Sequence, residues 1–287
     1  MSGKDAVART EALPLVRDIL ASALRELGLR AGMTLIVHSS LSSLGWVCGG
    51  AQTVILALED VLTSEGTLVM PEHSGDWSDP AEWRDPPVPE AWWPLIRTEM
   101  PLFDPDLTPS RGMGRIAETF RKQKGVLRSS HPQLSFAAWG RNRDYVLQDS
   151  HYDFAMNEKS PLGRIYELDG SVLLLGVGYS SNTSLHLAEY RLPRALCPLH
   201  RNGFPVPENS TGIWREFDDI DYNTDDFDEL GADFELSLGS HADGAEPILS
   251  AGRVGAAACR LLRQRPLVDY AADWMKKHRQ QAGTVPA

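Results

Sequence analysis

Ser171-Val172-Leu173-Leu174-Leu175-Gly176-Val177-Gly178 is an apolar run that ends in glycines and leads into Thr183-Ser184-Leu185-His186-Leu187-Ala188-Glu189. Its length and composition predict a buried strand. Asn182, Thr183 and Ser184 have short polar side chains of the kind that cap helix N-termini, so a helix is expected to follow the strand. The rest of the chain is organised around this unit, because open α/β sheets place their ligand crevices beyond the carboxyl ends of strands.

His186 and Glu189 lie three residues apart, on one face of the expected helix. An imidazole titrates near neutral pH, and a carboxylate one turn away can orient it and stabilise its charged form. The pair therefore suits a general base. A solvated helix face would carry the same two residues, and the position directly after a glycine-rich strand exit favours the functional interpretation.

Two similar units precede this one along the chain. Thr34 to Val37 predicts a short strand that leads into a small, polar loop from His38 to Gly45, and a helix is expected from about 52 to 62. Such a loop can offer backbone N–H groups and hydroxyls to a phosphate. It matches neither of the common glycine-rich nucleotide motifs, so the sequence does not predict a Rossmann or P-loop site. Gly66 to Pro71 predicts the next strand.

The remaining segments complete an α/β chain. Further helices are expected at about 12–29, 111–124, 160–168 and 248–275. Residues 75–110 are rich in proline and tryptophan and predict a long ordered excursion over the sheet. The stretch 205–238 is expected to be β-rich. We see no internal linker, so a single domain of residues 1–287 is expected.

The composition is that of a globular protein. The chain has 287 residues, 42% of them hydrophobic, which suffices for a substantial core. It has no run of eighteen apolar residues and no apolar signal-peptide core near its start, so we expect a cytoplasmic protein that does not bind membranes. Cys48, Cys197 and Cys259 have neither paired nor metal-ligand spacing, and we expect reduced thiols and no metal.

The net charge of −11 argues against nucleic acid as a partner and is compatible with a cationic one. The acidic residues are concentrated between Asp218 and Glu229, where seven carboxylates are interleaved with aromatic side chains. Solvated linkers seldom carry so many rings. This segment is therefore a candidate for binding a cationic ligand, with simple acidic solubility as the alternative.

Several sequence blocks occur in a specific order. They are Val37-His38-Ser39-Ser40-Leu41, Gly66-Thr67-Leu68-Val69-Met70-Pro71, Pro101-Leu102-Phe103-Asp104-Pro105, Arg128-Ser129-Ser130-His131-Pro132, Ser160-Pro161 and the run from Leu174 to Glu189. In this order they resemble the aminoglycoside 3-N-acetyltransferase family over about residues 20–260. The resemblance implies a three-layer α/β/α fold with a mixed central sheet, distinct from the common N-acetyltransferase fold.

The resemblance also implies an enzyme that moves an acetyl group from acetyl-CoA to the 3-amino group of the deoxystreptamine ring of aminoglycoside antibiotics, conferring resistance. His186 and Glu189 would face the acceptor amine, with His186 as general base in a direct transfer. The residues expected at coenzyme A are His38, Ser39, Ser40, Leu41, Val47, Arg128, Ser129, His131, Ser135 and Phe136.

The expected partners are therefore small molecules, and a polycationic acceptor would explain the carboxylates of the chain. Several ammonium groups are held best by several carboxylates in a cleft that partly excludes water. A tryptophan can add a stacking wall for a sugar ring. The residues expected at the acceptor are Glu72, Asp76, Trp77, Asp219, Asp221 and Asp225.

Other functions stay open at the level of sequence. The acceptor could be a non-antibiotic amine, with an acyl-CoA as donor. A Ser/His hydrolase could use Ser39 or Ser40 with His186, although the chain lacks the G-x-S-x-G elbow. A metallohydrolase built on several histidines lacks the usual ligand spacing. A non-catalytic protein could bind the same two ligands without transferring an acetyl group.

Overall fold

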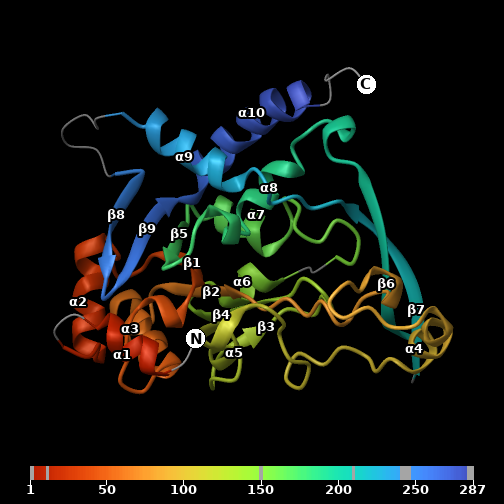
Figure 1. The fold of residues 1–287 in the computed structure, drawn as a ribbon, viewed down its shortest axis with the longest axis horizontal. Coiled ribbons are helices and arrows are strands. Elements are labelled where there is room, and N and C mark those ends of the chain that lie inside the picture. Colours follow the sequence, from red (N-terminus) through yellow and green to blue (C-terminus); the bar gives the residue numbers. More distant parts are fainter. Residues whose placement is uncertain (1–2, 11–12, 149–150, 209–210, 240–246, 283–287) are drawn as a thin grey trace.

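The computed structural model describes residues 3–10, 13–148, 151–208, 211–239 and 247–282. Its centre is a seven-stranded sheet with the strand order β3-β4-β2-β1-β5-β9-β8 (Figure 1). The strands are β1 (Thr34–Ser39), β2 (Thr67–Pro71), β3 (Leu127–Arg128), β4 (Phe136–Gly140), β5 (Ser171–Leu175), β8 (Leu249–Val254) and β9 (Ala257–Arg263). β1 pairs in parallel with β2 and β5, whereas β4 and β9 are antiparallel to their neighbours. The mixed central sheet is therefore confirmed.

Helices cover both faces of this sheet. The helices of the described residues are α1 (Gly3–Arg9), α2 (Arg17–Leu27), α3 (Ala51–Leu62), α4 (Trp93–Glu99), α5 (Gly114–Phe120), α6 (Arg143–Leu147), α7 (Pro161–Glu167), α8 (Leu185–Glu189), α9 (Phe227–Ser237) and α10 (Gln264–Ala282), and α4 lies apart from the sheet. One hydrophobic core joins α2, α3 and α5 to one face, and a second joins α7, α8, α9 and α10 to the other. Among the described residues, no helix is both long and apolar enough to span a membrane.

β5 lies near the middle of the sheet and is buried along its whole length. Successive side chains of a strand point to opposite faces. Leu173 and Leu175 accordingly belong to one core, and Val172 and Leu174 belong to the other. This two-sided burial explains the unbroken apolar run, because a strand covered by helices on both faces has no polar side.

The chain leaves β5 through Gly176, which has a φ of 74°. A Cβ at this position would lie 2.7 Å from the Cβ of Ser43 and 3.0 Å from that of Ala257. Both the backbone conformation and the lack of space therefore require glycine. The predicted helix then begins, and Asn182 Oδ1 accepts the N–H of Ser184 at 3.1 Å just before it.

Several other predicted elements are confirmed with shifted ends. The helix expected at 12–29 is the shorter α2, and the helix expected at 111–124 is the shorter α5. The helix expected at 160–168 is α7. Its cap is Ser160, whose Oγ accepts the N–H of Leu162 at 3.2 Å. Local composition thus located these elements, and packing decided how far each one extends.

Part of the predicted excursion at residues 75–110 lies away from the central sheet, whereas Pro105 and Thr108 near its end bond to Arg128 of β3. α4 forms within this excursion and packs against β7 of a separate two-stranded sheet, which consists of β6 (Leu199–Glu208) and β7 (Thr211–Ile220). Figure 1 shows α4 beside this hairpin, at one side of the molecule. A lone two-stranded hairpin is only marginally stable in water. The α4 part of the excursion therefore supports the hairpin.

The prediction that 205–238 is entirely β-rich is wrong for its second half, where α9 forms. The buried residues Phe227, Leu230, Gly231 and Phe234 follow the spacing of a helix face. Two acidic residues in the first turn also suit a helix N-terminus. In the structure, the buried residues of this half recur at the three- to four-residue spacing of a helix.

The helix predicted at 248–275 is wrong for its first half, where β8 and β9 form a hairpin. Alanine, leucine and arginine are good helix formers, which explains the expectation. Antiparallel pairing of β9 with β5 overrides that local preference. Gly255 makes the turn with a φ of 56°, and a Cβ there would lie 2.5 Å from the carbonyl oxygen of Leu44.

Replacing Leu262 by alanine tests the placement of β9 in the core. Leu262 is 0% exposed, and truncating such a side chain is expected to lower the free energy of unfolding by about 2–5 kcal/mol. The same change at Leu236, which is 81% exposed on α9, should cost less than about 0.5 kcal/mol. Urea unfolding followed by circular dichroism measures both values. Equal effects of the two changes would contradict this placement.

Candidate active site

The carboxyl ends of β1, β2 and β5 meet at one edge of the sheet because the three strands are parallel. Residues at and beyond these ends line a cavity of about 250 Å³. Its polar side chains are His38, Ser39, His73, Ser180, Ser181, Thr183 and His186. A larger cavity of about 450 Å³ lies at the opposite ends of β1 and β5, and no histidine lines it. The smaller cavity is therefore the candidate active site.

His186 and Glu189 contact each other, as their spacing predicts. Nδ1 of His186 lies 2.6 Å from Oε2 of Glu189, and Glu189 is fully buried. When Nδ1–H is donated to a carboxylate, Nε2 keeps the free lone pair, which is the arrangement of a general base. The rings of Tyr222 and Phe227 pack against the imidazole, with centroid distances of 4.9 and 5.1 Å.

Two more histidines share the cavity. Among the described residues, Nε2 of His38 and Nε2 of His73 are buried without a hydrogen-bond partner. Burial, together with the neighbouring His186, lowers the pKa of each imidazole to about 3. Both side chains are therefore neutral at pH 7, and each can make hydrogen bonds to a ligand. In the described part of the chain, no three His, Cys, Asp or Glu side chains are grouped as metal ligands.

Some residues of the loop after β1 line the cavity, and others bond or pack within the protein. Ser39 lines the cavity beside His38. Ser40 Oγ instead bonds to two neighbouring serine hydroxyls, at 2.9 and 3.2 Å. Leu41 packs against the hydrophobic core, and Val47 is buried and bridged to the segment before α2. Of the coenzyme residues predicted in this loop, the structure brings His38 and Ser39 to the cavity.

Arg128 holds three segments of the protein together. Its Nε donates to Ser135 Oγ (2.9 Å), its Nη1 to the carbonyls of Pro105 (3.3 Å) and Thr108 (2.5 Å), and its Nη2 to the carbonyl of Glu72 (2.6 Å) and to Ser74 Oγ (2.7 Å). A guanidinium has five N–H donors, and these contacts use all of them. The sequence places Arg128 among the residues expected at coenzyme A, whereas in the structure all five of its donors bond within the protein.

The other predicted coenzyme residues near Arg128 also bond within the protein. Ser129 Oγ accepts the N–H of Phe136 at 2.9 Å, and Ser135 Oγ donates to the carbonyl of Glu72 at 2.7 Å. Nδ1 of His131 accepts two backbone N–H groups, at 3.0 and 3.2 Å, and its Nε2 donates to a backbone carbonyl at 3.2 Å. Burial lowers the pKa of His131 to about 4. The side-chain polar atoms of Ser129, His131 and Ser135 thus bond within the protein, and their contact with coenzyme A stays a prediction.

Asp219, predicted to bind the acceptor, is held within the protein. Its carboxylate accepts the hydroxyls of Tyr190 and Tyr222, the latter at 2.8 Å, and the N–H of Ala155 at 3.1 Å. Burial raises the pKa of both tyrosines, and the charge of Asp219 adds to this effect. Both hydroxyls therefore stay protonated and donate to Asp219. The carboxylate positions Tyr222, whose ring contacts His186, instead of binding an ammonium group.

Asp221 and Asp225 are exposed, as acceptor-binding residues would be. They lie on a segment that touches the catalytic candidates, because the N–H of Asn223 donates to Oε1 of Glu189 at 3.3 Å. This contact brings the exposed half of the acidic stretch next to the His186–Glu189 pair.

Asp76 and Trp77 belong to the excursion and bond within it. The carboxylate of Asp76 pairs with Arg111. Nε1 of Trp77 donates to the carbonyl of Pro101 at 2.9 Å. The two side chains also border an apolar surface pocket of α4, which is separate from the cavity at His186. The structure therefore does not bring them to the expected acceptor site.

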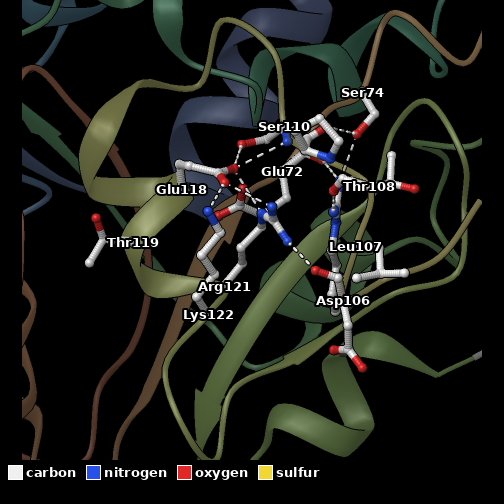
Figure 2. Close-up of polar contacts among 12 residues, drawn as sticks. Glu72, Ser74, Asp106, Leu107, Thr108, Ser110, Glu118, Thr119, Arg121 and Lys122 are labelled. Atoms are coloured by element: carbon white, nitrogen blue, oxygen red, sulfur yellow. Dashed lines mark hydrogen bonds and ion pairs between the residues drawn. The ribbon is translucent and has the colours of Figure 1, made fainter.

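Glu72 is buried and does not face a cleft as predicted. Among the described residues, neither of its carboxylate oxygens has a hydrogen-bond partner. Figure 2 shows Glu72 beside Ser110, Glu118 and Arg121, where Arg121 bonds to Glu118 at 2.7 and 2.8 Å. Burial raises the pKa of Glu72 to about 8, so the side chain is largely neutral at pH 7. In the protein without ligand, Glu72 is therefore not an exposed carboxylate of the kind expected at the acceptor.

Arg279 is a functional candidate that the sequence prediction missed, and His73 enters that prediction only as a metal ligand of the metallohydrolase alternative. His73 stands just past the end of β2, so it shares the strand-end position of His38, and that position is a usable signal. Arg279 donates to Oε1 of Glu189 at 2.7 Å from a position 90 residues further along the chain. No local pattern in the sequence indicates such a contact.

Comparison with known proteins identifies relatives along nearly the whole chain. A sequence model of the family described as aminoglycoside 3-N-acetyltransferase matches residues 36–276. The SPbeta prophage-derived aminoglycoside N(3')-acetyltransferase-like protein YokD of Bacillus subtilis (strain 168) is 43% identical over 269 residues, with 93% of this chain and 95% of that protein covered. The crystal structure of YokD has a TM-score of 0.90 at 42% identity and covers 97% of this chain and 99% of that chain.

More distant relatives also match nearly the whole chain. Aminoglycoside N(3)-acetyltransferase VII of Streptomyces paromomycinus is 35% identical over 276 residues, with 92% of each chain covered. A structure of AAC-IIIb in a binary complex with CoASH has a TM-score of 0.78 at 28% identity. That match covers 92% of this chain and 97% of that chain.

Glu72 is expected to contribute a decrease in stability as the pH rises from about 4.5 to about 8. Its pKa is raised from 4.5 to about 8, so the folded state holds this proton more tightly than the unfolded chain. The resulting stabilisation is complete below about pH 4.5 and is lost as the pH rises through about 8. Within this window, the group lowers the free energy of unfolding by up to about 1.4 kcal/mol per pH unit.

Glu72→Gln, which stays neutral, should remove this component of the pH dependence. Urea unfolding of wild type and variant across the window measures it. Glu65→Gln is the control, because Glu65 is exposed in a surface pair with Arg141, and this variant should retain the wild-type slope. Identical slopes for Glu72→Gln and wild type would show that Glu72 is not the group responsible.

Proposed function

The chain belongs to the aminoglycoside 3-N-acetyltransferase family, and we propose that it transfers the acetyl group of acetyl-CoA to the 3-amino group of the deoxystreptamine ring of an aminoglycoside, which confers resistance to that antibiotic. The observation that carries the proposal is the His186–Glu189 pair at the cavity where β1, β2 and β5 end. The related enzyme of Streptomyces paromomycinus supports the acceptor class, and the complex of AAC-IIIb with CoASH supports the donor.

His186 is the proposed general base. An amine attacks a thioester only in its neutral form, and it must lose a further proton as the amide forms. Nε2 of His186 accepts this proton while the C–N bond forms and the C–S bond breaks, and the leaving thiolate then takes it up. Glu189, which is bonded to Nδ1 at 2.6 Å, compensates the positive charge that develops on the imidazole.

The transfer is proposed to be direct, without an acyl-enzyme. A thioester is already activated, so no enzyme nucleophile is required. Ser40 Oγ bonds to neighbouring serines instead of His186, which does not favour Ser40 as the nucleophile of a Ser/His hydrolase, whereas Ser39 lines the cavity with His186. The backbone N–H of Ser40 donates to the carbonyl of Leu175, and that of Ser180 to Asp228, so these two amides are already occupied. They are poor candidates for stabilising an oxyanion.

The thioester end of acetyl-CoA is the part that the cavity suits. Its volume of about 250 Å³ is below the range of about 300–1,000 Å³ that is typical of whole small-molecule sites. The remainder of the coenzyme would therefore lie outside it. We assign His38 and His73 to the thioester end, because their Nε2 atoms are neutral, buried and without protein partners. Ser39 adds a hydroxyl at the same wall.

The acceptor is proposed to lie against the segment of Asp221 and Asp225. Both carboxylates are exposed, and Asn223 between them bonds to Glu189. An aminoglycoside carries several ammonium groups, so carboxylates beside the dyad would attract it and orient one amine toward His186. The net charge of −11 favours the approach of such a cation.

His186→Ala is expected to lower kcat by about 10²–10⁴-fold, because a positioned general base typically contributes that much. The KM for acetyl-CoA should change little, since the imidazole acts on the acceptor amine. Release of free coenzyme A, detected with a thiol reagent in the presence of an aminoglycoside panel and simple amines, measures both parameters.

His151→Ala serves as the matched control for that change, because His151 is exposed and lies outside the cavity. It should leave turnover unchanged. A His186→Ala enzyme that retains more than about half of the wild-type rate at neutral pH would rule out His186 as the base. Turnover with simple amines but not with aminoglycosides would show that the acceptor is another amine and not an aminoglycoside.

Asp221→Asn and Asp225→Asn are each expected to weaken aminoglycoside binding by up to about 1 kcal/mol, or about fivefold, because exposed charge pairs contribute no more than that. Acetyl-CoA binding should stay the same. The loss should shrink as salt rises, because exposed charges are screened over about 8–10 Å at physiological ionic strength. Calorimetric titration at low and high salt tests this, with Asp18→Asn on α2 as the charge-matched control. Unchanged affinity in both variants would exclude this segment from the acceptor site.

A further inference from the structure

We propose that Arg279, on the C-terminal helix α10, is a positioning residue that keeps Glu189 ionised and thereby holds His186 in its base-competent state. The inference rests on the proposed function of the His186–Glu189 pair and extends it to a part of the chain that no local motif connects with the site. Nη1 of Arg279 donates to Oε1 of Glu189 at 2.7 Å, while Oε2 of the same carboxylate bonds to His186.

The position of the guanidinium is fixed by a second carboxylate. Nε and Nη2 of Arg279 form two parallel bonds to Asp226, at 2.8 and 2.9 Å, and Nη2 also donates to the carbonyl of Asn223 at 3.2 Å. Such a bidentate pair restricts orientation as well as distance. The side chain is 14% exposed. Asp226 therefore holds the fork so that Nη1 points at Glu189.

Glu189 needs this cation because it has no contact with water. Its side chain is 0% exposed, and a buried carboxylate without a counter-charge takes up a proton instead of staying ionised. A protonated Glu189 would no longer stabilise a positive charge on His186. The neutral imidazole would also lose the acceptor that fixes its tautomer. Arg279 acts on the reaction through this one oxygen and touches no substrate.

The core of the protein sets the place of Arg279. α10 packs against α8 and α9, and Leu267, Val268, Ala271 and Met275 on its inner face are fully buried. Figure 1 shows α10 running along the same side of the sheet as α8 and α9. This packing brings the last turns of α10 over the dyad.

Titratable and charged groups face the His186–Glu189 pair from several elements. They are His38 at the end of β1, His73 after β2, Cys197 before β6, Tyr222 and Asp226 between β7 and α9, and Arg279 on α10. Arg279 is the cation that contacts the carboxylate directly. Removing its charge makes protonation of both members of the pair easier, so protonation should then occur at higher pH.

The test compares pH profiles of kcat for wild type, Arg279→Gln, Arg279→Lys and Arg265→Gln. Arg279→Gln should move the acid limb to higher pH by about one unit or more, which lowers kcat by about tenfold at pH values on that limb. The KM for acetyl-CoA should stay within about twofold. Arg279→Lys keeps the charge and should restore most of the wild-type profile. Arg265 lies on the same helix but packs on Tyr166, so its variant should match wild type.

A double-mutant cycle with Glu189→Gln shows whether Arg279 acts through Glu189. In that background no buried carboxylate remains to be compensated, so adding Arg279→Gln should have little further effect on kcat. The double variant leaves no unpaired carboxylate at position 189, while Asp226 loses its bidentate partner in Arg279→Gln and in the double variant alike, so that loss enters both comparisons equally. Additive losses in the cycle would overturn the inference.

The Nδ1–H proton of His186 provides a readout besides activity. Its downfield NMR resonance should be present at neutral pH in wild type and Arg279→Lys, absent in Arg279→Gln, and restored there at higher pH. A folded Arg279→Gln variant with the wild-type resonance and acid limb would overturn the inference even if the enzyme is fully active. A wild type that shows the resonance but transfers no acetyl group would contradict the proposed function instead.

Discussion

The parallel pairing of β5 with β1 is the constraint on which the site depends. Because both strands run in the same direction, His38 at the end of β1 and the turn after β5 open at the same edge of the sheet. Gly176 provides the tight exit from β5, and α8 then places His186 in the cavity with His38. β2, parallel to β1 on its other side, adds His73. These two pairings thus assemble three imidazoles that lie far apart in the sequence.

The protein treats its buried ionisable groups according to their partners. Arg128 stays charged because five oxygens accept its N–H groups. Glu72 has no partner among the described residues, and burial makes it a neutral acid at pH 7. Glu189 accepts hydrogen bonds from His186 and Arg279, and these partners stabilise an ionised carboxylate. A buried charge without partners is costly, so each group is either paired or neutralised.

The blocks that carry the family resemblance therefore fall into two structural classes. The blocks of His38 and of His186 line the cavity, whereas the block of Arg128 and His131 joins strands and loops through hydrogen bonds within the protein. Substitutions are poorly tolerated in both classes, because a buried polar network is destabilised when one member is lost. The family resemblance alone does not distinguish blocks that line the cavity from blocks that hold the fold together. The hydrogen-bond partner of each side chain in the folded protein does distinguish them.

The sequence by itself determined the features that are local: the apolar run of β5, the polar start of α8 and the contact of His186 with Glu189, which follows from helical spacing. It could not determine β9, because alanine, leucine and arginine favour a helix and pairing with β5 outweighs that preference. Only the tertiary structure decided that Arg128 is occupied, that Glu72 is buried and that Arg279 reaches Glu189. The physical reason is that each of these facts depends on which distant segments pack together, and such packing leaves no period or spacing in the chain.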